Sequence, residues 1–270
     1  MDIYNFGKEL IVKAGQFVET RMTKEFKVDS KSNPNDLVTD VDKETEQFLY
    51  TEIQEKFPDH RIIGEEGHGE NITDTKGVIW IVDPIDGTLN FVHQGENFAI
   101  SIGVFIDGEP YCGLIYDCMK RDLYHAKYKQ GAFLNDQPLA HAKNEPLSKS
   151  LIATNPKRIL REAAKDSFFN IMAASRSVRS YGSAALEFAM LAKGQIAALL
   201  FIKLHPWDYT GGQIITGELG YKTTDIHGNE LPLLGTTSVI SGNPEIHSDI
   251  LEFFKNDKTL HDFHDDFHNL

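Results

Sequence analysis

An apolar strand that runs directly into two carboxylates constrains this chain more than any other feature. Val78–Val82 is a short apolar run, and Asp83-Pro84-Ile85-Asp86-Gly87-Thr88 follows it without a polar spacer. Carboxylates at the mouth of a buried strand are poorly placed to serve as solubilising groups. If several of them converge, their mutual repulsion raises their pKa values and lowers stability unless a cation is present.

Two further acidic motifs strengthen the interpretation that these carboxylates bind a cation. Gly64-Glu65-Glu66 ends a predicted strand over 60–64, and Pro206-Trp207-Asp208-Tyr209 stands at the start of a predicted helix. Hard oxygen ligands of this kind suit Mg2+ or Mn2+. Two such ions about 3.5–4 Å apart could share Asp83 and clamp a phosphate between them.

The residues between Asp83 and Thr88 also favour a particular backbone conformation. Pro84 fixes one backbone angle, so we expect Asp83 and Asp86 on opposite sides of a tight turn. Gly87 lets the chain approach a ligand closely, and its N–H with that of Thr88 would face an anion where a helix begins.

Taken alone, Pro-x-Asp-Gly is a common turn sequence and favours an ordinary loop with no function. An EF-hand is excluded because the stretch after Gly87 is apolar and lacks the closing glutamate. The sequence contains neither Gly-x-x-x-x-Gly-Lys nor His-Glu-x-x-His. Asp40-Val41-Asp42 suggests an aspartyl-phosphatase signature, but Lys43-Glu44 does not continue it.

The hydrophobic period predicts the order of elements. Residues 2–22 form an amphipathic helical pattern, and Thr39-Asp40-Val41-Asp42 has the form of a capping box that opens a second helix ending at Pro58. Strand patterns follow, with a hairpin predicted across Asp107-Gly108 in a mostly antiparallel sheet.

The later segments predict a strand over 196–201 and helices over 183–193 and 209–219. This pattern indicates two α/β halves that share one core. We place them at 1–145, which carries most of the metal-ligand candidates, and 146–270, which completes the site.

Composition excludes some classes of function. With 27 basic and 40 acidic residues the net charge is −13, which argues against nucleic acid and against anionic membrane surfaces as partners. Bound cations can still make a phosphate pocket locally positive. No run approaches the roughly 18 apolar residues of a membrane helix, and the N-terminus lacks a signal-peptide pattern. With Cys112 and Cys118 expected as buried free thiols, we expect a cytoplasmic protein.

In this order, the Gly64-Glu65-Glu66, Asp83–Thr88 and Trp207-Asp208 motifs resemble the inositol monophosphatase family. That family belongs to the lithium-sensitive, magnesium-dependent phosphatase superfamily, which includes fructose bisphosphatases. The resemblance spans residues 5–245 and includes Asn-Asp-Leu-Val-Thr before Asp42 and Gly182-Ser183-Ala184-Ala185. It implies an α/β (mixed α+β) fold built as a five-layer αβαβα sandwich, a homodimer, and hydrolysis of phosphoric monoesters.

The resemblance also implies residue roles. Two or three Mg2+ ions, with Mn2+ as an alternative, would be held by Glu65, Asp83, the carbonyl of Ile85, Asp86, Thr88 and Asp208. The catalytic residues would be Asp42 and Thr88, which activate water, and Glu65, which helps to position it. The small phosphorylated substrate would contact Gly87, Thr88, Ser183, Ala184 and Asp208. Lys31 and Asp36 lie in a loop that covers the metals in relatives, although a solvated polar loop is nearly as good an interpretation.

One departure leaves the substrate open. Many inositol-specific relatives carry a glutamate seven residues before the aspartate of the Trp-Asp motif, and this chain has Phe201 there. Losing an acceptor for a substrate hydroxyl weakens the case for inositol monophosphate. The 2′-phosphate of NADP, fructose 1,6-bisphosphate and a 3′-phosphoadenosine phosphate are alternatives. A non-catalytic regulatory binding role is the other class.

The tail His261-Asp262-Phe263-His264-Asp265-Asp266-Phe267-His268 suggests a metal site by composition. We expect a frayed, charged terminus there instead.

Overall fold

The computed structural model describes residues 2–31, 37–69, 71–160 and 166–268. Its helices are α1 (Ile3–Met22), α2 (Asp40–Lys56), α3 (Thr88–Gln94), α4 (Pro156–Ile159), α5 (Asp166–Ala174), α6 (Ala184–Ala192), α7 (Pro206–Gly217), α8 (Pro244–Phe254) and α9 (Lys258–His268). Its first strands are β1 (Val28–Ser30), β2 (Leu37–Thr39), β3 (Arg61–Gly64), β4 (Val78–Asp86), β5 (Ala99–Ile106), β6 (Glu109–Asp117), β7 (Asp122–Lys127), β8 (Ala132–Leu134) and β9 (Gln137–Pro138). The remaining strands are β10 (Leu151–Thr154), β11 (Ser177–Arg179), β12 (Ala198–Leu204), β13 (Lys222–Thr224) and β14 (Thr237–Gly242).

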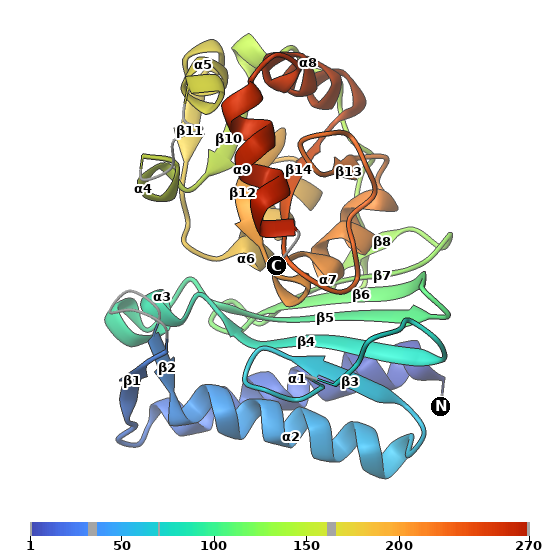
Figure 1. Ribbon diagram of the computed structural model, residues 1–270. Coiled ribbons are helices and arrows are strands. Elements are labelled where there is room, and N and C mark those ends of the chain that lie inside the picture. Colours follow the sequence, from blue (N-terminus) through green and yellow to red (C-terminus); the bar gives the residue numbers. More distant parts are fainter. Residues whose placement is uncertain (1, 32–36, 70, 161–165, 269–270) are drawn as a thin grey trace.

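These elements stack in five layers (Figure 1). Helices α1 and α2 cover one face of a sheet with strand order β3-β4-β5-β6-β7-β8-β9. Helices α6 and α7 fill the space between it and a second sheet, ordered β11-β10-β12-β14-β13. Helices α5, α8 and α9 cover the far face of the second sheet. The expected αβαβα sandwich is confirmed.

The capping box expected at the start of α2 is present and fixes Asp42. The Thr39 hydroxyl accepts from the backbone N–H of Val41 at 3.1 Å, and the Thr39 N–H donates to the Asp42 carboxylate at 2.9 Å. The reciprocal bonds satisfy donors that a helix N-terminus leaves without intrahelical partners. Asp42 is consequently held in place before any ligand arrives.

Strand β4 differs from its prediction in a way that matters for the site. The tight turn expected at Pro84 is wrong, because β4 continues through Asp83 to Asp86 and pairs with β5 on both sides of a register shift. A bulge accommodates an extra residue and a proline that cannot donate to the ladder. The two aspartates are therefore presented by a bulged strand instead of a loop.

Helix α7 begins at Pro206, as the Pro206–Tyr209 motif predicted and three residues before the predicted range 209–219, because proline is well suited to the first turn of a helix. It lies very close to the first sheet. A Cβ added to Gly113 of β6 would stand 2.3 Å from the carbonyl oxygen of Gly211, and one added to Gly103 of β5 would stand 2.6 Å from the Thr210 hydroxyl. Glycines at this contact let the helix bring Asp208 close to the end of β4.

The strands of the two sheets lie on either side of residue 145, and apolar side chains from both halves meet in one cluster around α6 and α7. Cys112 and Cys118 are buried free thiols, as expected. Over the ranges described, no helix has the length and apolar character needed to cross a bilayer. The expectation of a frayed terminus is wrong for residues 258–268, since α9 is a helix that buries Leu260 and His264.

Candidate functional site

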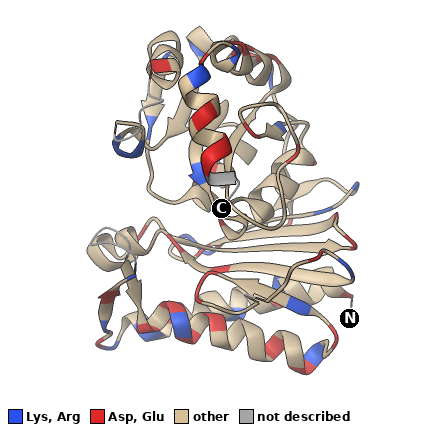
Figure 2. Cartoon of the chain, viewed as in Figure 1, with Lys and Arg blue, Asp and Glu red and all other residues tan. Residues whose placement is uncertain are grey.

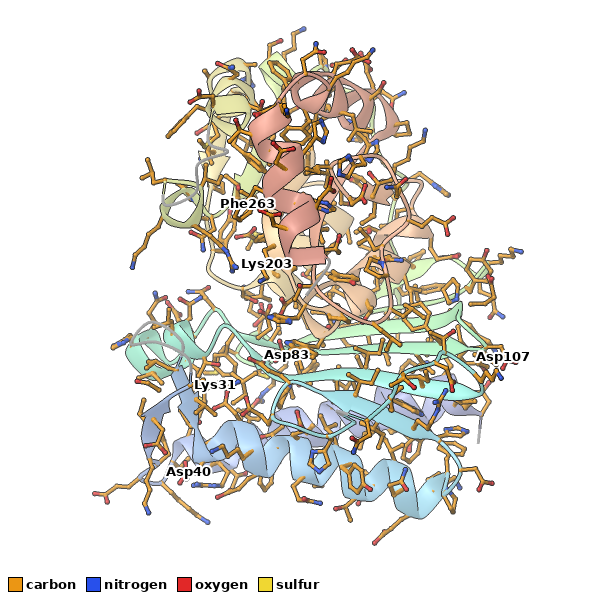
Figure 3. The ribbon with its side chains drawn as sticks, in the orientation of Figure 1. Lys31, Asp40, Asp83, Asp107, Lys203 and Phe263 are labelled. Carbon is orange, nitrogen blue, oxygen red and sulfur yellow. The ribbon has the colours of Figure 1, made fainter. Side chains whose placement is uncertain are left out.

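Three aspartates from two elements meet where the two halves join. Asp83 and Asp86 come from the end of β4 and Asp208 from the first turn of α7. One carboxylate oxygen of each lies within 4.8 Å of those of the other two. Figure 3 labels Asp83 at this junction, above the first sheet. The structure thus brings together side chains that are 122 residues apart (208 − 86) in the sequence.

Backbone and side-chain donors fix each of these carboxylates. The N–H of Ile85 donates to Asp83 at 3.0 Å. The Ser183 hydroxyl and the Ala185 N–H donate to one oxygen of Asp86, each at 2.5 Å. The N–H of His205 donates to Asp208 at 2.7 Å. The carboxylates are held through single oxygens, in fixed orientations.

The electrostatics of this cluster favour a bound cation. Burial, and after it the charges of Glu65, Asp86 and Asp208, holds the pKa of Asp83 well above its usual range. Burial also raises the pKa of Asp86 to about 6, although hydrogen bonds from Ser183 and Ala185 oppose the shift. A divalent ion would remove this repulsion, and carboxylate oxygens are the ligands that Mg2+ and Mn2+ prefer. The residues present therefore fit such an ion.

Glu65 follows β3 and lines the same cleft as Asp83 and Asp208. It pairs with Lys31, whose ammonium lies 2.9 Å from Glu65 and 2.6 Å from Glu66. Lys31 of the predicted covering loop thus reaches the acidic motif, while Asp36 lies outside the described residues.

Asp42 and Thr88 form the pair that the sequence suggested. The Thr88 hydroxyl lies 3.0 Å from one Asp42 oxygen and 3.2 Å from the carbonyl of Ile85. Asp42 is 1% exposed, and burial raises its pKa, although hydrogen bonds from Thr39 and Thr88 oppose the shift. A hydroxyl that donates to a carboxylate keeps its lone pairs as acceptors. The pair can accordingly accept a proton at the Thr88 oxygen.

Gly87 and Thr88 form the start of α3. Gly87 has φ +99°, a left-handed conformation that favours glycine, and a Cβ there would lie 3.2 Å from Ser183. The glycine therefore permits both the bend and the close approach to the second half.

Two adjoining clefts join these residues. The first, of about 180 Å³, is lined by Leu37, Glu65, Asp83, Ile85, Asp86, Gly87, Thr88, Leu89, Gly182 and Asp208. The second, of about 200 Å³, is lined by Asp86, Asn155, Arg158, Ser180, Gly182, Ser183, Ala184, Glu187, Phe201, Lys203, Leu204 and Asp208. Because both include Asp86 and Asp208, the acidic cluster lies where the two clefts meet. All the expected metal and substrate residues line one or both.

Glu46 was not singled out from the sequence, yet it shapes the acidic motif. Its fully buried carboxylate accepts from the N–H of Glu66 at 2.8 Å and lies 2.6 Å from the Nδ1 atom of His68. A Cβ on Gly64 would stand 2.4 Å from this carboxylate. The sequence places Glu46 on α2, one turn after Asp42, and this was the only signal available. Its role depends on contacts with Glu66 and His68, which are distant in the sequence.

Glu187, Arg158 and Lys203 were also missed, and all three line the second cleft. Glu187 accepts from the N–H of Tyr181 at 2.8 Å and so helps to hold the segment before Ser183. Burial raises its pKa to about 8. Arg158 and Lys203 place positive charge beside Phe201, on α4 and β12 (Figure 2).

Comparisons with known proteins show the family of this chain. Residues 2–258 match the model of the inositol monophosphatase family. The chain belongs to that family. It is 45% identical to the inositol-1-monophosphatase of Bacillus subtilis (strain 168) over 253 residues, which cover 93% of this chain and 96% of the relative.

Solved structures of the family have the same fold. The crystal structure of inositol monophosphatase-II from Staphylococcus aureus MSSA476 superposes with a TM-score of 0.91 at 42% identity, covering 98% of each chain. A structure of an IMPase/NADP phosphatase complexed with Mg2+ and phosphate gives 0.84 at 28% identity, covering 91% of this chain and 92% of that one.

Because the pKa values of these aspartates are raised, we predict that the metal-free protein becomes less stable as pH rises. A carboxyl whose pKa is raised on folding stabilises the folded state at low pH, and that contribution disappears as pH rises through the raised pKa, near 6 for Asp86. In EDTA, the free energy of unfolding should fall by roughly 1–3 kcal/mol between pH 5 and pH 8. Urea unfolding at each pH measures it.

Saturating Mg2+ and the Asp86→Asn variant are the controls, since each should reduce the slope, while Glu187, outside the acidic cluster, contributes to the slope in every sample. The same slope in all three samples would show that repulsion in the cluster is not its cause.

Proposed function

We propose that this protein hydrolyses a small phosphomonoester in a reaction that depends on divalent metal ions. The observation that carries the proposal is the convergence of Asp83, Asp86 and Asp208 beside the hydrogen-bonded pair of Asp42 and Thr88. The chain's membership of the family supports the same reaction class. A purely regulatory binding protein would not need this set of side chains intact.

The ions we propose are Mg2+, two or three per chain, with Mn2+ as an alternative. Their ligands would be Glu65, Asp83, the carbonyl of Ile85, Asp86, Thr88 and Asp208, all of which line the first cleft. Bound there, the ions would offset the phosphate charge and increase the acidity of water. The relative complexed with Mg2+ and phosphate supports this choice of metal.

The chain's own residues would perform the proton transfer and the positioning. The Thr88 oxygen accepts the proton of the attacking water, and its own hydroxyl proton moves toward Asp42, whose raised pKa suits it to receive one. Glu65 orients the water. The N–H groups of Gly87 and Thr88 donate to the phosphate at the start of α3. Water attacks the phosphorus directly as the ester P–O bond breaks, and the leaving alkoxide takes a proton from solvent, so no covalent phosphoenzyme is needed.

Two substrate classes are the candidates for the second cleft. Inositol monophosphate is supported by the name of the B. subtilis relative. Its inositol ring would contact Ser183, Ala184 and Asp208. A nucleotide such as NADP, cleaved at its 2′-phosphate, is the second candidate, because Arg158 and Lys203 would receive a further anionic group where Phe201 offers no acceptor for a hydroxyl. The IMPase/NADP phosphatase in the family supports it. Fructose 1,6-bisphosphate and 3′-phosphoadenosine phosphate are further candidates, because each also carries a second phosphate that Arg158 and Lys203 would bind.

We also propose that the protein acts as a cytoplasmic homodimer. The family resemblance supports the dimer, and the two buried free thiols suit a reducing compartment.

The Asp86→Asn substitution tests the reaction class. It removes one charged oxygen ligand and keeps the size of the side chain, so kcat in saturating Mg2+ should fall by about 100-fold or more. Phosphate release from inositol monophosphate, NADP, 2′-AMP and fructose 1,6-bisphosphate measures it. Asp59→Asn, at an exposed aspartate that lines neither cleft, should match the wild type. The proposal fails if the wild type hydrolyses none of these esters, or if Asp86→Asn hydrolyses them equally fast.

The Lys203→Met substitution tests the substrate class. It keeps most of the aliphatic stem and removes the charge, so kcat/KM for NADP should fall by roughly 10-fold while that for inositol monophosphate stays within about threefold. Equal losses for both substrates would contradict a role for Lys203 in holding a second anionic group.

A further inference from the structure

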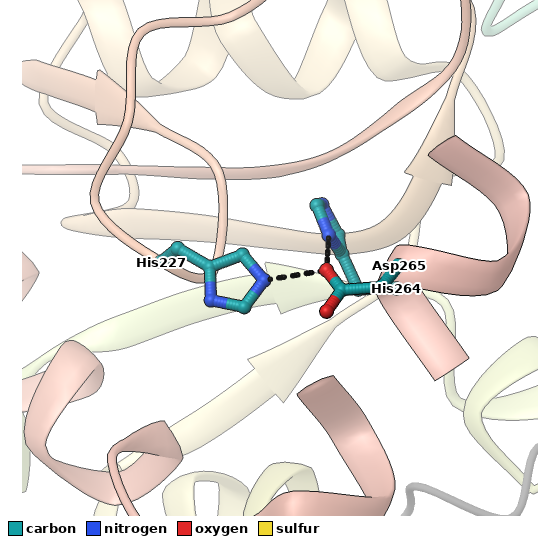
Figure 4. Close-up of side chains that lie close together, drawn as sticks. All are labelled: His227, His264 and Asp265. Carbon is teal, nitrogen blue, oxygen red and sulfur yellow. Dashed lines mark hydrogen bonds and ion pairs between the residues drawn. The ribbon is translucent and has the colours of Figure 1, made fainter. Parts of the chain in front are cut away.

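We propose a second metal site in this protein, for a divalent transition metal such as Zn2+, formed by His227, His264 and Asp265. It lies in the second half, between helix α9 and the turn that joins β13 to β14, and is composed of residues that the hydrolytic reaction does not use (Figure 4). One possible ligand atom of each residue lies within 4.8 Å of those of the other two.

The donor set has the chemistry of a zinc site, and two of its donor distances are close to those of one. Two imidazole nitrogens and a carboxylate oxygen suit Zn2+, whereas Mg2+ prefers oxygen ligands alone. At bond lengths of about 2.0–2.1 Å, tetrahedral ligand atoms lie about 3.3 Å from one another. One oxygen of Asp265 lies 3.1 Å from the Nε2 atom of His227 and 3.6 Å from the Nδ1 atom of His264. Solvent would complete the coordination.

Local structure places these side chains before any metal binds. His264 and Asp265 follow one another on α9, and the His264 side chain is 2% exposed. His227 stands on a turn in which the buried carboxylate of Asp225 accepts from the N–H groups of His227 and Asn229, each at 2.8 Å. The site would therefore join two segments that are already ordered.

The hydrogen bonds of a fourth residue, His261, leave the neutral cluster one positive charge short, which a metal ion or a proton would supply. The Nε2 atom of His261 lies 2.9 Å from the carbonyl of Phe254, which only accepts, so that nitrogen carries a hydrogen. In neutral His261 the Nδ1 atom is then an acceptor, and it lies 3.0 Å from the Nδ1 atom of His227. The Nδ1 atom of His227 must accordingly donate.

Neutral His227 has one N–H, so its Nε2 atom would direct a lone pair at the Asp265 carboxylate, which also only accepts. A cation between them resolves the conflict. A metal bound by Nε2 of His227, His264 and Asp265 would leave the chain of donors from His227 through His261 to Phe254 intact. Outer partners of this kind commonly fix the orientation of metal-binding histidines.

Zinc binding to the full-length protein tests the proposal. Zn2+ is titrated in excess Mg2+, which occupies the acidic cluster, and bound zinc is counted by equilibrium dialysis with elemental analysis. The wild type should bind one more Zn2+ per chain than His227→Asn, and Zn2+ should raise its thermal midpoint. Asp265→Asn, at an exposed position, should weaken this binding at least 10-fold, and His261→Phe by about 10–100-fold through loss of the outer partner.

Asp262→Asn is the matched control, because it removes an exposed charge from the same helix outside the cluster, and it should bind zinc like the wild type. Phosphate release in Mg2+ should be the same in all these variants. Equal zinc binding by the wild type, His227→Asn and Asp265→Asn would overturn the proposal, and so would a wild type that binds no additional zinc, in which case a proton fills the role of the cation.

Discussion

The mutual repulsion of buried carboxylates is the constraint on which the rest of this structure depends. Asp83, Asp86 and Asp208 meet at the junction of two sheets, and burial together with their neighbours' charges raises the pKa of Asp83 and of Asp208 well above the usual range. Such a cluster lowers the stability of the protein unless a cation joins it. The same feature that costs stability without metal would therefore create a strong site for divalent ions and for a phosphate.

The fold holds these groups in place through backbone contacts that do not depend on the ligand. A bulge in β4 presents Asp83 and Asp86, and the glycine contact between β6 and α7 lets Asp208 approach them. The capping box at Thr39 fixes Asp42 beside Thr88. Preorganised groups of this kind need little rearrangement during reaction, which is how enzymes stabilise developing charge.

Much of this could be predicted from the sequence, because its signals are local. The capping box, the hairpin at Asp107-Gly108 and the acidic motifs are each written in a few adjacent residues, and the order of the motifs indicated the family. Pro84 misled the turn prediction, since a bulge admits proline as readily as a turn does. Glu46 and Lys203 were missed because their meaning lies in contacts across the fold. The ordering of α9 was missed for a related reason: its charged sequence resembles a solvated tail, and only packing of Leu260 and His264 shows otherwise.

The most direct test of the central claim is anomalous scattering from crystals grown with Mn2+ and phosphate. The account predicts at least two manganese peaks in contact with the carboxylates of Asp83, Asp86 and Asp208, with phosphate between the metals and the start of α3. The absence of manganese from these carboxylates, at a concentration that supports phosphate release, would contradict it.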